Sequence, residues 1–227
     1  MKTPRFILGF SLCLVFILIY TDRNLLEKGR LIIDKDIVSV EVSFINFEGE
    51  KCRGILEVHK NVKDEVINIF KEIEEIGFPI FKMETIDKYD YDDEKSVVAN
   101  NSSAYNFRFV NGSTKLSDHA IGLAIDINPV QNPWVHPSAL NKFPYIPGEK
   151  GTIEANSDIV NIFNKWGWSW GGNWKNPDYQ HFFKGGDINK NIKNKLYSDL
   201  GIENPYFKKV TKGRIDRFKD FIKRIIR

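Results

Sequence analysis

Two stretches of the chain carry side chains that could hold a divalent metal ion. His119 and Asp126 lie in the first stretch, 117–126, and His181 lies in the second. Two imidazoles, one carboxylate and an open position for water form the inventory of a catalytic zinc site. Asp178, three residues before the last histidine, is a spare carboxylate that could take a proton from such a water. These residue types indicate metal-assisted hydrolysis.

The residues around Asp126 alternate in the manner of a β-strand. In the segment 122–127, the apolar side chains Leu123, Ile125 and Ile127 point to one face, which we expect to enter the core. The opposite face carries two very small residues and then Asp126. A bulky group could therefore lie against that face, beside the carboxylate.

The remaining pattern predicts an α+β fold. Apolar alternation predicts a strand over 38–44, and a short strand is expected at 181–183. Helical spacing predicts a helix over 62–73 that Gly77 stops, and Ser157 can cap a second helix. We expect a small antiparallel sheet with helices packed on one side and the zinc site at the open face of the sheet.

The motifs resemble a known family. Ser-x-His-x-x-Gly-x-Ala-x-Asp at 117–126 is followed by Trp-Gly-Gly-x-Trp at 170–174 and Asp-x-x-His-Phe at 178–182. This combination is similar to the zinc peptidase family of D-alanyl-D-alanine carboxypeptidases and dipeptidases and the L-alanyl-D-glutamate peptidases of phage endolysins. The resemblance covers roughly 51–184, includes the segment 100–108, and implies a hedgehog-like or D-Ala-D-Ala peptidase-like fold.

The resemblance implies a role for six residues. Three of them match the family's ligands for Zn²⁺: His119, Asp126 and His181. Asp178 matches the general base. Arg108 lies where the family places an arginine near the substrate carbonyl or carboxylate, so it is implied in catalysis and in substrate binding. Ser117 matches a serine that contacts substrate.

These implied roles favour a zinc-dependent peptidase that hydrolyses peptidoglycan stem peptides. Aspartate at position 178 and the pattern at 170–174 favour an L-alanyl-D-glutamate endopeptidase, with a D-alanyl-D-alanine carboxypeptidase as the alternative. A non-catalytic zinc-containing cell-wall binding module is an alternative of another class, because hedgehog domains have a similar metal site yet serve as ligands. The intact Asp178 favours the enzyme.

The two ends of the chain differ from the peptidase domain, which we place at 30–204. Lys2 and Arg5 precede an uncharged apolar run, so 1–24 is read as an uncleaved signal-anchor in preference to a cleaved signal peptide. The domain should then lie outside the cytoplasm, in the cell envelope, and contact the membrane through this segment. In that location nucleic acid is not an expected partner.

The C-terminal segment 205–227 is predicted to form a basic amphipathic helix. Its last twenty residues hold nine Lys or Arg and two Asp, a net charge of +7 within a chain whose total is +3. The helix could dock on the domain with its basic face in water, or it could contact anionic lipid or an acidic wall polymer.

Several other polar residues receive structural interpretations. His59 is expected to have a structural or surface role, and His136 to be an ordinary loop residue, with a place on the cleft rim as the alternative. The acidic run 90–94 lacks the spacing of a calcium loop and is read as a solvated loop. About half of the tryptophans in 166–174 should pack in the core, and the others could form a cleft wall. No disulfide is expected between Cys13 and Cys52.

Overall fold

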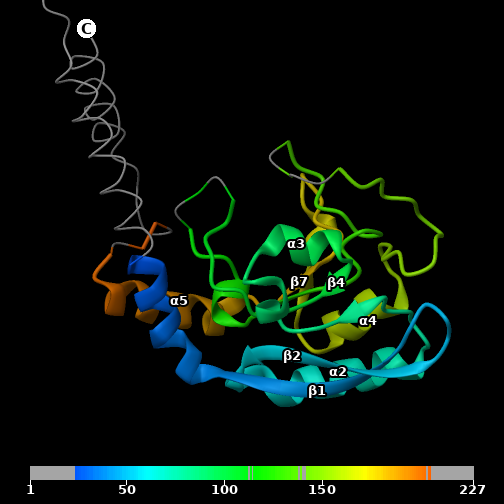
Figure 1. Cartoon of the computed structure of the whole chain (residues 1–227), viewed down its shortest axis with the longest axis horizontal. Helices are drawn as coiled ribbons and strands as arrows, with labels where there is room; N and C mark the ends of the chain where they lie inside the picture. Colours follow the sequence, from blue (N-terminus) through cyan, green and yellow to red (C-terminus); the bar gives the residue numbers. More distant parts are fainter. Residues whose placement is uncertain are drawn as a thin grey trace, which may run out of the picture.

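The computed structural model describes residues 24–111, 113, 115–137, 139, 142–202 and 204–205 (Figure 1). Apart from Asn24 and Pro205, the predicted signal segment and the predicted C-terminal helix lie outside these residues, and both stay predictions. Within the described ranges, no helix has the length and apolar character that crossing a bilayer requires.

A long antiparallel hairpin forms one side of the molecule. Its strands are β1 (Ile37–Ile45) and β2 (Lys51–His59), in a register that places Val40 opposite Leu56. The alternation predicted for 38–44 is confirmed, because Val40, Val42 and Phe44 are all buried. The tight turn between the strands is closed by Asn46, whose Oδ1 accepts hydrogen bonds from the backbone N–H groups of Glu48 and Glu50.

Two helices cover the core. The predicted first helix is α2 (Lys63–Glu75), which lies along β1. Gly77 follows it with φ of +66° and donates its N–H to Glu74 O, so the predicted stop is confirmed. The second helix, α4 (Asp158–Lys165), contacts α2 and β6 (Ser169–Trp170). The predicted side-chain cap is wrong, because the Ser157 hydroxyl donates to Glu154 O instead of accepting from the helix.

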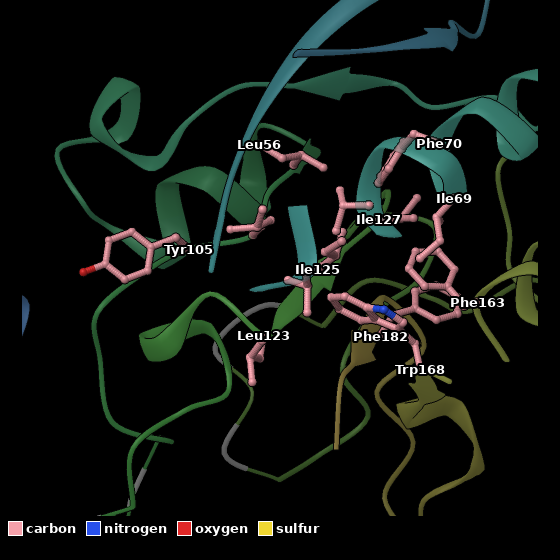
Figure 2. Packing of buried hydrophobic residues seen from close by; sticks show 14 of the residues in the cluster. Leu56, Ile69, Phe70, Tyr105, Leu123, Ile125, Ile127, Phe163, Trp168 and Phe182 are labelled. Atoms are coloured by element: carbon pink, nitrogen blue, oxygen red, sulfur yellow. The ribbon is translucent and has the colours of Figure 1, made fainter. Parts of the chain in front are cut away.

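A three-stranded antiparallel sheet carries the residues of interest. Its order is β5 (Ala124–Asp126), β7 (His181–Phe183), β6, with Asp126 opposite His181. Figure 2 shows one face of this sheet in the core. Its apolar side chains pack there with those of α2 and α4, and the labelled members are Ile125, Ile127, Phe182, Ile69, Phe70 and Phe163.

Short connections join the remaining elements. β3 (Lys82–Met83) pairs in parallel with β4 (Asn101–Ser102), and Ser103 then bridges to Asp126. Helix α3 (Asp93–Val98) precedes β4 and contacts it. Helix α5 (Gly186–Leu200) lies beside the helical residues 24–33 in Figure 1.

The fold class α+β, with small antiparallel pairings and helices, is confirmed, but the single sheet is wrong. The described strands form three short sheets linked by isolated bridges. β3 pairs with β4 instead of joining the hairpin. Gly54 on β2 lets β3 approach closely, since a Cβ atom at Gly54 would lie 2.6 Å from the Met83 side chain.

Candidate metal centre and catalytic cleft

Asp126 and His181 meet because their strands place them directly opposite each other. Adjacent residues of each strand point to opposite faces, so burying Ile125 and Phe182 in the core sends Asp126 and His181 to the other face. Both polar residues are buried despite facing away from the core. The sheet thus brings together two donors that are 55 residues apart in the sequence.

A tight turn delivers His119 to the same place. It is the 3₁₀ turn η4 (His119–Ile121), which ends at Gly122 in the left-handed conformation with φ of +64°. A Cβ atom at Gly122 would lie 2.4 Å from the backbone N of His59, which donates to Gly122 O. Only glycine lets the turn press this closely on the end of β2.

The three predicted ligands form one compact cluster. His119 Nε2 lies 3.1 Å from Asp126 Oδ2, and His181 Nδ1 lies 3.0 Å from Asp126 Oδ1. The two ring nitrogens are 3.1 Å apart. A tetrahedral zinc ion with bonds of about 2.0–2.1 Å separates its donors by roughly 3.3–3.4 Å. The two ring nitrogens are within about 0.3 Å of this separation, and one ligand atom from each of the three residues lies within 4.8 Å of the others.

The protonation of His119 suits a metal ligand. Its Nδ1 lies 2.5 Å from Ala104 O, a carbonyl that can only accept, so Nδ1 carries a proton and leaves Nε2 as the atom that can bind an ion. Burial alone would raise the pKa of Asp126, but His119 and His181 hold this pKa well below its usual range. The chemistry of these donors, two imidazoles and an ionised carboxylate, therefore fits Zn²⁺.

Asp178 faces the same cleft as the cluster. Its Oδ1 is buried and has no hydrogen-bond partner. Burial raises the pKa of Asp178 to about 7, the charge of Asp126 adds to the rise, and His181, His119 and Arg108 oppose it. A half-buried carboxylate with a pKa near neutrality is the kind of group that serves as a general base.

The glycines of the Trp-Gly-Gly-Asn-Trp pattern explain how Asp178 reaches this position. A Cβ atom on Gly171 would lie 2.8 Å from Asp178 O and 3.3 Å from His181 Cβ. One on Gly172 would lie 2.2 Å from the Trp170 ring. The backbone of Gly171 also accepts the N–H of Asp178. The pattern therefore packs one turn of chain closely against the segment that holds Asp178 and His181.

The cluster opens into a cleft of about 620 Å³. Trp134 and Trp174 line it, and Trp174 is 42% exposed with its ring 5.4 Å from that of His181. Trp168 and Trp170 are buried in the core. The prediction that the tryptophans divide between core and cleft wall is consistent with these positions.

Arg108 and Ser117 also line the cleft. Arg108 is half-buried, and its Nε donates to Asp93 Oδ1 at 3.1 Å. Ser117 is buried, and its Oγ accepts the backbone N–H of His119 at 3.3 Å. Ser117 thus helps to fix the turn that carries His119, in addition to facing the cleft.

Comparison with known proteins bears directly on this cleft. Residues 111–184 match the family model described as D-alanyl-D-alanine carboxypeptidase. This match confirms the predicted resemblance to that zinc metallopeptidase family. Comparisons with curated proteins and with solved structures found no significant match.

The matched span contains five of the six predicted site residues, and Arg108 lies three residues before it. The family match supports a metallopeptidase that acts on peptidoglycan-type substrates. Among the described residues, the His119, Asp126 and His181 cluster is the one group of its kind that could hold a metal ion.

Residues outside the motifs complete the cleft or support its walls. The acidic run was read as a solvated loop, but Asp92 caps α3 and Asp93 holds Arg108. Nothing in the local pattern signals this pairing, since the partners are 15 residues apart. His59 has a structural role as expected, because its Nδ1 accepts the N–H of Asn61. His136 is a loop residue that stacks on Trp134.

Proposed function

We propose that the protein is a zinc-dependent peptidase that hydrolyses peptidoglycan stem peptides in the cell envelope, outside the cytoplasm. One observation carries the proposal. The buried, unpartnered Oδ1 of Asp178 lies in the same cleft as the cluster of His119, Asp126 and His181. A binding module would gain nothing from keeping a carboxylate oxygen buried without a partner, whereas a hydrolase needs a base there.

The proposed roles follow from the chemistry of each side chain. Zn²⁺, when held by His119, Asp126 and His181, supplies Lewis-acid chemistry that polarises a carbonyl and acidifies water. Asp178 accepts the proton of the attacking water and later gives it to the leaving amine. Arg108 places a fixed positive charge in the cleft, where it stabilises the oxyanion or binds a substrate carboxylate.

Two bonds of the stem peptide are candidates for cleavage. Aspartate as the base and the Trp-Gly-Gly-Asn-Trp pattern favour the L-alanyl-D-glutamate bond. The description of the matching family favours the terminal D-alanyl-D-alanine bond, and Arg108 in the cleft suits a terminal carboxylate.

Mass spectrometry of purified muropeptides incubated with the zinc-loaded protein tests the proposal. Loss of terminal D-alanine identifies a carboxypeptidase, and separation at the L-alanine side identifies the endopeptidase. Intact muropeptides in the presence of stoichiometric zinc would contradict a peptidase function and support the binding module. Protein treated with a chelator is the matched control, and it should be inactive in either case.

Activity is expected to fall at acid pH, because only the ionised form of Asp178 can accept a proton. Burial raises the pKa of this carboxyl to about 7, and a bound cation lowers it, so the acid limb of kcat/KM should lie between its ordinary pKa of 3.8 and about 7. Arg108→Met removes a charge that lowers this pKa, so it should move the limb to higher pH. Zinc content measured at each pH separates this effect from ligand protonation. An acid limb of kcat/KM that stays at the same pH or moves to lower pH in Arg108→Met would contradict the assignment of Asp178 as the base.

Asp93→Asn is expected to raise KM for the stem peptide about three- to tenfold, because Arg108 loses its charged hydrogen bond and its fixed orientation. Zinc content should not change. Glu94→Gln is a matched control, since Glu94 also lines the cleft and its substitution removes one negative charge from the first turn of α3, as Asp93→Asn does. Steady-state kinetics with equal KM changes in both variants would contradict a specific role for Asp93.

A further inference from the structure

The side chain of Gln180 is a buried amide without a partner in the cleft wall. The residue is only 7% exposed, it lines the cleft, and its Oε1 is inaccessible and accepts no hydrogen bond. Among the described residues, Asp178 Oδ1 is the one other buried side-chain nitrogen or oxygen atom without a hydrogen-bond partner. Both orphan atoms therefore belong to the four-residue segment that ends at His181.

The backbone around Gln180 is held by hydrogen bonds and ring stacking, so a poorly held loop does not explain the unpaired amide. The carbonyl of Gln180 accepts the N–H of Ile127 at 3.0 Å. The preceding carbonyl, that of Tyr179, accepts the Trp170 indole N–H at 2.8 Å. The Tyr179 ring stacks on Tyr145 with centroids 3.6 Å apart. The fold thus fixes Gln180 in place while leaving its amide oxygen unused.

Other amides of this protein do not share this condition. Gln131, the only other glutamine of the chain, accepts a hydrogen bond from Asn100 at 2.9 Å. The buried Asn132 donates to Gly151 O at 2.9 Å and accepts the N–H of Ile153 at 2.7 Å. Buried polar groups are nearly always paired, so an exception in a cleft wall points to a partner that binds there.

The chemistry of the orphan atom limits what that partner can be. An amide oxygen only accepts, so it suits an N–H donor and does not suit a carboxylate. A peptide in the cleft offers such donors at every residue. We propose that Gln180 is a substrate-binding residue. Its side chain turns toward the cleft when the stem peptide binds, and Oε1 then accepts a hydrogen bond from a peptide N–H. The assignment rests on the proposed peptidase function and adds a specificity contact to it.

Gln180→Met tests this inference, because methionine keeps the length of the side chain and removes the acceptor. The zinc-loaded full chain is assayed with a muropeptide that the wild type cleaves. KM should rise roughly three- to tenfold, the range for loss of one hydrogen bond, with zinc content unchanged. Gln131→Met is the matched control, because Gln131 is not among the residues that line the cleft, and it should leave KM unchanged. An unchanged KM for Gln180→Met would overturn the inference.

Thermal unfolding of the metal-free proteins provides a second, independent measurement. Because Gln180 Oε1 is buried without a hydrogen bond, Gln180→Met should keep or raise the unfolding midpoint. Gln131→Met should lower the midpoint, because it breaks the hydrogen bond from Asn100. A lower midpoint or a failure to fold in Gln180→Met would show that the amide is structural and would overturn the inference. If the wild type cleaves no muropeptide, the peptidase proposal fails separately, and this measurement still tests whether the amide is unpartnered.

Discussion

Asp178→Asn is expected to retain zinc and to lose nearly all peptidase activity. The substitution preserves the size of the side chain but removes the group that accepts the proton of the attacking water. General base catalysis contributes a factor of about 10²–10⁴, so turnover should fall by at least that order. Asp178 does not belong to the three-donor cluster, which is why the metal should stay.

The same substitution should stabilise the metal-free protein at high pH. Burial raises the pKa of Asp178 from 3.8 to about 7, so the folded state holds a proton more tightly than the unfolded state does. Stability from this group is therefore full below pH 4 and is lost as the pH rises through about 7. At pH 8 the asparagine variant should gain of the order of 1–3 kcal/mol, the usual cost of a buried polar group without a partner. Near pH 4 the gain should vanish.

Three measurements on one preparation of Asp178→Asn test these expectations. Activity assays follow the loss of turnover, metal analysis follows the retained zinc, and denaturant unfolding follows the gain in stability. Asp158→Asn, at an exposed position in the first turn of α4, is the control and should change neither turnover nor metal binding. Full turnover in a zinc-replete Asp178→Asn protein would remove the base from the mechanism. Unchanged activity together with lower stability at pH 8 would mean that Asp178 is a structural residue.

Local patterns in the sequence determine much of what surrounds the site. The alternation at Leu123, Ile125 and Ile127 predicted their burial, and the same alternation placed Asp126 on the opposite face. Helical spacing predicted α2 and its stop at Gly77. These features depend on residues a few positions apart, where the period of the backbone is enough to assign a face.

Features that depend on distant partners were not predictable in this way. The single expected sheet is instead three, since β3 pairs with β4 and not with the hairpin, and no local pattern indicates this partner. The pairing of Asp93 with Arg108 and the unpaired amide of Gln180 likewise emerge only when separate segments meet. The motifs predicted the three clustered donors and the carboxylate beside them, whereas the residues proposed to orient substrate come from the tertiary arrangement.

His119→Ala is expected to lose both zinc and activity. Of the three donors in the cluster, His119 alone comes from the 3₁₀ turn, and its Nε2 is oriented by the contact of Nδ1 with Ala104 O. Removing it leaves Asp126 and His181, two ligands where a catalytic zinc site uses three. Changes in the residues that merely orient a ligand cost about 10–100-fold in metal affinity, so loss of the ligand itself should cost more.

Metal titration followed by thermal unfolding measures this loss. A ligand that binds only the folded state stabilises it by about 4 kcal/mol at a free concentration 1,000 times Kd, so zinc should raise the unfolding midpoint of the wild type. The rise should be absent in His119→Ala, and bound zinc should fall from one per chain to a small fraction after dialysis. His136→Ala is the matched control, because His136 is a loop residue outside the cluster and the variant should bind zinc as the wild type does. Stoichiometric zinc with unchanged affinity in His119→Ala would show that the ion sits elsewhere, and the metal centre proposed at Asp126 and His181 would then have to be abandoned.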